Sequence, residues 1–438
     1  MNIISILIGK IIIFLGKIFK RGSSLPGVII LKINKKIFKY FKLPKNVIAV
    51  TGSSGKGSTS SMIASILRDN GYTVAHNKNG SNLIFGILTL LLENTKLNGT
   101  IDADYLVYEV DERYTKYVFK EVKPSYVVIT NITRDQPPRQ GNTDIVAGSI
   151  INGLTNDMHL ILNGDDPILR QFVDKNKVTY YGIDKNKYSY KISKFQSLNV
   201  TYCPKCHNKL EYNYYHFEDS GDYYCPKCNF KRPNIDYLVT KINYNKSIIE
   251  IDDIELNIPY NILFAVNNVA AAYTVCSLLK LDKNKIASSI NKLYKNKKIF
   301  NEYPYKNRKV TVLNNKNENS STFNQSLLYV SRFNNKKTIL IGWKEISRRY
   351  NFDDISWLYD IDFEILKSDL VEKIVCVGIN RYDIATRIKY AGLENKVVVF
   401  SNLIEATNYI KDKTKEDIYA IVNFDYVKPF NELMNEGD

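Results

Sequence analysis

A glycine-rich turn between an apolar segment and a polar helix start is the feature that most constrains this sequence. Residues 47–51 read Val-Ile-Ala-Val-Thr, and residues 52–59 read Gly-Ser-Ser-Gly-Lys-Gly-Ser-Thr. Apolar side chains at helical spacing follow between Met62 and Leu67. The glycines let successive backbone N–H groups point at one concave spot. The pattern therefore predicts a strand, a loop that cradles phosphate groups and a helix in direct succession.

This loop carries the groups that hold a nucleotide triphosphate. Lys56 supplies a positive charge for the β- and γ-phosphates, and Ser58 or Thr59 offers a hydroxyl to Mg²⁺. The match to the general pattern is imperfect, because Val50 stands where that pattern has its first glycine. A glycine- and serine-rich turn without a ligand is the alternative. The predicted nucleotide-binding residues of the loop are Gly52, Ser53, Gly55, Lys56, Gly57, Ser58 and Thr59.

Short apolar segments alternate with helical stretches from residue 46 to about residue 298. This alternation predicts a parallel sheet with crossover helices, and therefore an α/β fold. The predicted strands are Val47–Thr51, Thr73–His76, Tyr105–Val110, Tyr126–Thr130 and His159–Asn163. The predicted helices are Ser58–Asn70, Ile84–Leu92 and Ile145–Leu154.

Polar side chains follow three of these strands, at the sheet edge where ligands of α/β proteins bind. Glu109 ends one strand, and a carboxylate there is expected to hold Mg²⁺ directly or through water. Asn131 and Asp135 follow the next strand, and Asp165 follows a third. A solvated charge at a strand end is the alternative for each of them, but their order along the chain favours one common site.

Four of the six cysteines form two Cys-Pro-Lys-Cys pairs, Cys203 with Cys206 and Cys225 with Cys228. The stretch between the pairs is rich in tyrosine and predicts a β-hairpin. Two such knuckles complete a closed tetrahedral site for structural Zn²⁺. The alternative is two unrelated pairs of thiols, and His207 is not expected to be a ligand. This usage of cysteine indicates a reducing, cytoplasmic setting.

The chain has 438 residues, enough for about three domains, and a formal net charge of +16. Abundant lysine accompanies abundant asparagine, isoleucine and tyrosine, a compositional bias that weakens the charge as evidence for nucleic acid. The segment Met1–Phe19 is strongly apolar, interrupted by Lys10 and Lys17. We interpret it as an amphipathic helix that packs on the protein or lies in a membrane interface. A transmembrane anchor is the third alternative.

The loop, the strand-end Glu109, the Thr-Asn-Ile segment with Asn131, and the Leu-Asn-Gly-Asp-Asp-Pro segment resemble the central ATPase domain of the Mur ligase superfamily. The resemblance implies ATP as the nucleotide. It also places Asn267 near the adenine, with Asn268 as the neighbouring register. The Gly-Lys-Gly-Ser sequence at residues 55–58, with Gly57 after the lysine, resembles the loop of folylpolyglutamate synthases. This resemblance implies that Ser58 supplies the hydroxyl for Mg²⁺.

The remaining motifs resemble the MurT branch of this superfamily, the ligase-like subunits of lipid II isoglutaminyl synthase. They are the cysteine insertion, Leu25-Pro-Gly27, the segment 353–364 with its Asp-x-Ser-Trp motif, and residues 383–392. The resemblance implies ATP-dependent amidation of the D-glutamate α-carboxylate in the lipid II stem peptide, through an acyl phosphate. Lys56, Glu109 and Asp354 would be its catalytic residues, and Asp353 is the alternative register for Asp354.

The resemblance further implies a heterodimer with a GatD-type glutaminase, and a cytoplasmic location that is peripheral to the inner membrane face, where lipid II lies. The expected domains are an N-terminal helix and linker (1–45), a central ATP-binding domain (46–298) and a C-terminal MurT-type α/β domain (299–438). The zinc-ribbon insertion is expected at about residues 200–232.

Three departures from the family pattern concern substrate binding and turnover. They are Pro138, Phe264 and the segment 316–324. The alternative functions are a Mur-type ligase that adds an amino acid to a related acyl substrate, a nucleotide-binding zinc-ribbon protein associated with nucleic acid, and a scaffold without turnover. The zinc ribbon and the Asp354 segment argue against the first of these.

Overall fold

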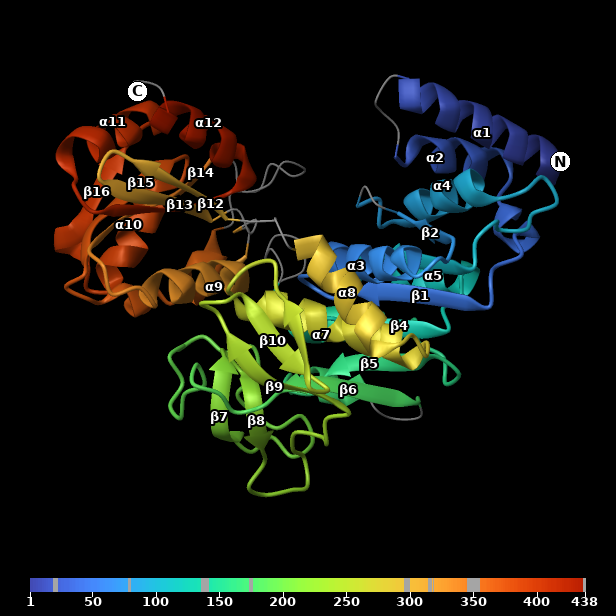
Figure 1. Ribbon diagram of the computed structural model, residues 1–438, viewed down its shortest axis with the longest axis horizontal. Helices are drawn as coiled ribbons and strands as arrows, with labels where there is room; N and C mark the ends of the chain where they lie inside the picture. The colour runs from blue at the N-terminus through green and yellow to red at the C-terminus, as the bar shows by residue number, and fades with distance from the viewer. Residues whose placement is uncertain are drawn as a thin grey trace.

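The predicted strand is an interior strand of a nine-stranded sheet, third from one edge, and the predicted loop and helix follow it (Figure 1). The computed structural model describes residues 1–18, 23–77, 80–134, 142–172, 176–294, 300–313, 317, 319–344 and 355–435. The strand order is β11-β10-β9-β6-β5-β4-β1-β3-β2. All pairs from β2 to β9 are parallel, and β10 and β11 extend the sheet in antiparallel fashion. The strands are β1 (Asn46–Thr51), β2 (Val74–His76), β3 (Tyr105–Glu109), β4 (Tyr126–Ile129), β5 (His159–Asn163), β6 (Val178–Ile183), β9 (Tyr237–Asn243), β10 (Ile248–Ile251) and β11 (Ile254–Asn257).

Helices cover both faces of this sheet, as a buried parallel sheet requires. The alternation of β1 sends Ile48 and Val50 into one core and Val47 and Ala49 into the other. The first core is closed by α3 (Lys56–Asp69), α7 (Leu263–Leu278) and α8 (Lys283–Tyr294). The second core is closed by α1 (Asn2–Ile18), α2 (Leu25–Ile33), α4 (Ile84–Asn94), α5 (Thr115–Glu121) and α6 (Thr143–Ile151).

A six-stranded sheet forms the C-terminal part, in the order β12-β13-β17-β14-β15-β16 (Figure 1). Only the β12–β13 pair is antiparallel. Its strands are β12 (Asn301–Tyr305), β13 (Arg308–Leu313), β14 (Lys337–Trp343), β15 (Val371–Gly378), β16 (Val397–Phe400) and β17 (Asp417–Val422). One face packs on α9 (Ser320–Ser331) and α10 (Arg381–Tyr390), and the other packs on α11 (Leu403–Lys413) and α12 (Phe424–Asn435).

The five strands and three helices expected from the sequence are confirmed, with ends that differ by a few residues. The hairpin expected between the cysteine pairs is also confirmed, as β7 (Glu211–Phe217) and β8 (Ser220–Tyr224). The sequence did not indicate β6, β9, β10 and β11 of this sheet, and the last three mix polar and apolar residues without the continuous apolar character of the inner strands. Among the described residues, no helix has the length and apolarity needed to cross a bilayer.

Candidate nucleotide site and cysteine cluster

The glycine loop connects the end of β1 at Thr51 to the start of α3 at Lys56. Gly52 has φ 123° and Gly55 has φ 85°, a left-handed region that favours glycine because it has no Cβ. The backbone N–H of Thr59 donates to the Gly55 carbonyl at 2.9 Å, so the helix begins directly after the turn. The N–H groups of a first helical turn have no acceptor within their own helix, which suits this turn to an anion.

Asn131 braces the loop from the end of β4. The Ser54 N–H donates to Asn131 Oδ1 at 3.0 Å, and Asn131 Nδ2 donates to the Ser54 carbonyl at 3.0 Å. The Ser53 N–H donates to the Asn131 carbonyl at 2.9 Å. The side chain predicted to bind nucleotide therefore fixes the shape of the loop itself.

Lys56 forms an ion pair with Glu112, a residue that the sequence analysis did not single out. Its Nζ lies 2.9 Å from Glu112 Oε2, and the two side chains are only 12% and 3% exposed. Lys56 Nζ also donates to the carbonyl of Gly52. The sequence could have indicated Glu112 as a site residue, because it lies three residues beyond Glu109 at the same strand end, where ligand-binding groups gather.

Glu109 lies at the carboxyl end of β3, directly against the start of α3. A Cβ added at Gly57 would lie 3.0 Å from Glu109 Oε2, so the carboxylate faces the loop at that residue. Asn82 Nδ2 donates to Glu109 Oε1 at 3.0 Å, and Asn77 pairs with the Glu109 backbone at 2.9 Å in both directions. Asn77 directly follows β2, so the strand-end rule used for Glu109 could have found it.

The two candidate hydroxyls occupy different environments. Ser58 is exposed in the first turn of α3, whereas Thr59 is fully buried. The Thr59 Oγ1 has no hydrogen-bond partner in the part of the chain that the structure describes. Ser58 is therefore the accessible hydroxyl of the pair.

Of the two asparagines at the start of α7, Asn268 lies against the loop. A Cβ at Gly55 would lie 2.3 Å from Asn268 Oδ1. Asn267 is 8% exposed, and its Oδ1 finds no partner among the described residues. Phe264 stands one turn earlier and packs against Phe217 of the hairpin, with ring centroids 5.8 Å apart.

Asp165 belongs to a buried ion pair and lies outside the loop's immediate contacts. Arg232 Nε donates to Asp165 Oδ1 at 2.7 Å, and the Ile183 N–H donates to Asp165 Oδ2 at 2.8 Å. The pair ties the end of the cysteine-bearing insertion to β5 and β6. Three further residues of the sequence analysis, Asp135, Asp353 and Asp354, lie outside the described residues.

The four predicted cysteines form one cluster. Their sulfur atoms all lie within 4.8 Å of one another, with Cys203 and Cys228 separated by 3.6 Å and Cys206 and Cys225 by 3.4 Å. A small core supports the cluster, formed with the cysteines by Leu210, Tyr223 and Phe230. Four thiol groups at this spacing could hold one metal ion, and their chemistry fits Zn²⁺.

The tip of the β7–β8 hairpin enters the junction with the C-terminal part. Glu218 is 3% exposed, and it accepts from Ser321 Oγ at 2.7 Å and from Asn324 Nδ2 at 3.0 Å, both on α9. Burial, together with the nearby Asp219, raises the pKa of Glu218 to about 8. A second link lies nearby, where Arg134 pairs with Asp360 at 2.7 Å.

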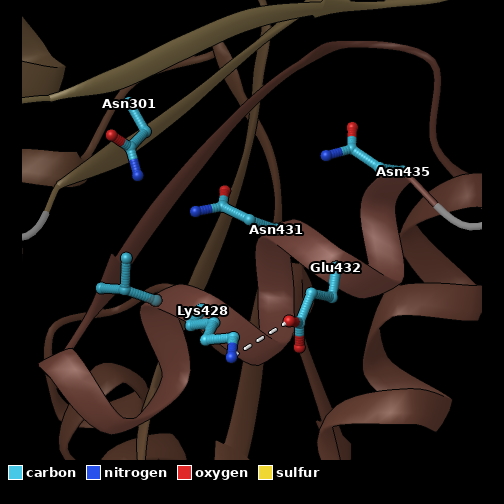
Figure 2. A pocket seen from close by; sticks show the side chains of 6 residues that line it. Asn301, Lys428, Asn431, Glu432 and Asn435 are labelled. Carbon is cyan, nitrogen blue, oxygen red and sulfur yellow. Dashed lines mark ion pairs between the residues drawn. The ribbon is translucent and has the colours of Figure 1, made fainter.

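A separate hollow on the C-terminal part lies between β12 and α12 (Figure 2). Asn301, Asn431 and Asn435 line it beside the exposed Lys428–Glu432 ion pair, whose atoms are 3.5 Å apart. No residue of the glycine loop lines this hollow, so it is distinct from the candidate nucleotide site.

Comparison with known proteins agrees with this geometry. The family model of the MurT ligase C-terminal domain matches residues 317–426, and that of the Mur ligase middle domain matches residues 50–216. A pseudomurein peptide ligase type C from Methanothermus fervidus superposes with a TM-score of 0.65 and 21% identity, covering 91% of this chain and 80% of the other. MurF ligase from Thermotoga maritima, solved in complex with ADP, superposes with a TM-score of 0.60 and 18% identity, covering 93% of this chain and 83% of the other. These two structures confirm the Mur ligase-type α/β fold.

Two curated relatives extend over nearly the whole chain, and both are named lipid II isoglutaminyl synthase (glutamine-hydrolyzing) subunit MurT. The protein of Staphylococcus aureus (strain COL) is 30% identical over 422 residues, which cover 95% of this chain and 94% of the relative. That of Streptococcus pneumoniae (strain ATCC BAA-255 / R6) is 26% identical, with coverages of 94% and 92%. The resemblance inferred from the motifs is thereby confirmed, and the chain belongs to the MurT family of Mur-type ligases.

Proposed function

We propose that this protein is the ATP-dependent amidating subunit of a lipid II isoglutaminyl synthase. The proposed reaction converts the α-carboxylate of D-glutamate in the lipid II stem peptide to D-isoglutamine. The observation that carries the proposal is the 30% identity to a subunit of that name, extending over 94% of the relative. It extends through the glycine loop and the C-terminal segments together, so the likeness concerns the whole protein.

The loop contacts support ATP as the phosphoryl donor. The first turn of α3 offers its N–H groups to phosphate oxygens, and Lys56 brings the nearest cation on that helix. Glu109 faces the same turn, and with the exposed Ser58 it would hold Mg²⁺. Asn267 would serve the base, since its buried oxygen has no partner within the described ranges.

These groups suit transfer of the γ-phosphoryl group to the acceptor carboxylate. Lys56 would neutralise charge on the transferring group, and Mg²⁺ supplies further electrostatic stabilisation when bound. The product would be an acyl phosphate, whose carbonyl carbon ammonia attacks while phosphate leaves. We assign Asp354 to the handling of ammonia, as the family resemblance implies, with Lys56 and Glu109 as the other catalytic residues.

The cysteine cluster would hold structural Zn²⁺, because four thiolates leave no coordination position open for a reactant. The ammonia would come from a GatD-type glutaminase bound as a heterodimer partner. The proposed acceptor is a membrane lipid, so the protein would act in the cytoplasm at the inner membrane face.

The experiment that tests the proposal follows ADP release by the purified chain with ATP, Mg²⁺ and lipid II. Ammonium chloride alone should support ADP release and amidation, and glutamine should do so only when the glutaminase is present. Amidation with ammonium but not with D-amino acids would separate this function from that of an amino acid-adding ligase. Absence of ADP with every peptidoglycan precursor, despite intact ATP binding, would rule out the enzyme.

A further inference from the structure

Helix α1 packs on the protein through a narrow side that includes the buried Ile6, and it leaves a second apolar side exposed. Ser5, Ile6 and Gly9 are buried, and the Asn34 amide donates to Asn2 Oδ1 at 2.8 Å. A Cβ at Gly9 would lie 3.0 Å from Leu92 of α4, so the helix approaches the body closely at that point. A surface helix of a globular protein usually turns its one apolar stripe toward the core and a polar face toward solvent, whereas α1 is apolar on its exposed side as well.

Six large apolar side chains of α1 form what we call the outer face. Their exposed fractions lie between 44% and 65%, so each keeps close to half or more of its surface in contact with solvent. At about 100° per residue they fall within an arc of about 120° that contains no polar residue. The outer face consists of Ile4, Leu7, Ile11, Phe14, Leu15 and Ile18.

The outer face has an exposed position in the fold. Helix α1 lies over α2 and α4 at the end of the molecule opposite the C-terminal sheet (Figure 1). A continuous apolar surface of this kind on a protein marks an interaction site. The outer face is therefore available to a large, flat partner.

The charge around the outer face identifies that partner. Residues 1–45 contain ten lysine and arginine residues and no aspartate or glutamate. On α1 itself, Lys10 and Lys17 lie two turns apart along the same border of the outer face, and the Lys17 side chain is 66% exposed. Within the described part of the chain, the acidic side chain that pairs with them is Glu93 of α4, whose Oε1 lies 2.6 Å from Lys17 Nζ.

We propose that α1 lies in the plane of an anionic lipid bilayer, with its outer face immersed among the acyl chains and its basic border at the headgroups. The apolar face suits the acyl chains of such a bilayer, and the flanking cations suit its anionic headgroups. The inference deepens the proposed function, whose acceptor is a lipid, by naming the surface that brings the protein to the membrane.

The test is sedimentation of the full chain with phosphatidylglycerol vesicles and with phosphatidylcholine vesicles, without ATP or acceptor. We expect binding to the anionic vesicles that weakens as salt is raised. The double variant Ile11→Gln/Phe14→Gln should bind the anionic vesicles at least about tenfold more weakly, because it loses two apolar side chains that would be immersed in the bilayer. Equal binding by this variant, or no binding by the unaltered chain, would overturn the inference.

The matched control is Ile192→Gln/Ile404→Gln, which alters two exposed apolar residues away from α1, 83% and 58% exposed. It should bind vesicles like the unaltered chain. A Phe14→Trp variant should be quenched by lipids brominated in their acyl chains, and Ile192→Trp should not. Quenching of both or of neither would contradict immersion of the outer face alone.

Two further measurements distinguish a bilayer from the other possible partners of the outer face, which are a second copy of the chain and the glutaminase. Light scattering without vesicles should give the same mass for the unaltered chain and the double variant. A loss of mass in the variant would assign the face to a second copy. Vesicle binding that disappears when the glutaminase is bound would assign it to that partner. Vesicle binding without ADP release would contradict only the proposed function. ADP release without vesicle binding would contradict only the inference about α1.

Discussion

The Lys56 ammonium lies 2.9 Å from the Glu112 carboxylate, and both side chains are nearly buried at the start of α3. The helix that offers its N–H groups to phosphate is thus joined to the segment after β3, which also carries Glu109. Next to them, Arg113 Nε lies 3.0 Å from Asp111 Oδ1. Burial raises the pKa of Asp111, but the hydrogen bonds and charge of Arg113, with the charge of Lys56, outweigh burial and lower this pKa overall. The cationic and anionic groups at this edge of the sheet therefore form one connected set.

Replacing Lys56 by alanine should abolish ADP release. The variant removes the cation assigned to the transferring phosphoryl group, so we expect a loss of turnover of about a hundredfold or more. Lys246→Ala, which removes an exposed lysine away from the loop, is the matched control and should keep full activity. An unchanged rate in Lys56→Ala would refute the phosphate role of this residue.

Replacing Glu109 by glutamine should raise the Mg²⁺ concentration needed for half-maximal ADP release by about tenfold, because a neutral amide is a weaker ligand for a hard cation. Circular dichroism should show an intact fold, since glutamine retains an oxygen for the Asn82 bond. The control Glu121→Gln alters an exposed carboxylate on α5 and should leave the Mg²⁺ dependence unchanged. The same dependence in both variants would exclude Glu109 as a Mg²⁺ ligand.

Replacing Cys225 by serine should remove the bound metal. Elemental analysis is expected to find about one zinc per chain in the unaltered protein and almost none in the variant. The midpoint of thermal unfolding should also fall, because the hairpin that carries Glu218 loses its support. Cys276→Ala is the control, since Cys276 is buried in α7 outside the cluster and its loss should leave the zinc in place. Zinc retained by Cys225→Ser would disprove the four-cysteine site.

Stability should depend on pH through Glu218. Its pKa is about 8 in the folded chain, against an ordinary value of 4.5, so between these values the folded state binds more protons than the unfolded state. The free energy of unfolding should therefore fall as pH rises from about 5 to about 8, by at most about 1.4 kcal/mol per pH unit from this group. Glu218→Gln should show a shallower decline.

Chemical denaturation across this pH range measures the difference between the two curves. Other buried carboxyls also contribute, since the pKa values of Asp219 and Asp362 are raised to about 6 by burial, but they are common to both proteins. Glu394→Gln, at an exposed position, should reproduce the unaltered curve. Parallel curves for Glu218→Gln and the unaltered chain would show that Glu218 is ionised in the folded state.

The features that the sequence predicts well are those specified by nearby residues. The strand before Gly52, the spacing of the cysteines and the position of Glu109 at a strand end are local patterns, and the structure contains each of them. The contacts that complete the site join segments far apart in the chain. Asn82 reaches Glu109 across 27 residues and Ser321 reaches Glu218 across 103, so no local pattern could indicate either pair.

Helical register was a second limit on prediction. Asn267 and Asn268 are neighbours in sequence, but they point about 100° apart on α7, and only Asn268 meets Gly55. The orientation of α1 was a third limit. Its sequence indicated an amphipathic helix, but not that Ser5, Ile6 and Gly9 would face the protein, because this depends on the surface of α2 and α4.

The most direct test of the proposed function supplies the chain and a GatD-type glutaminase with ATP, Mg²⁺, lipid II and glutamine labelled with heavy nitrogen in its amide. The account predicts that mass spectrometry finds the label in a new amide on the D-glutamate α-carboxylate, with one ADP released for each amide formed. An unlabelled, unmodified stem peptide, or ADP released without any amide, would contradict it.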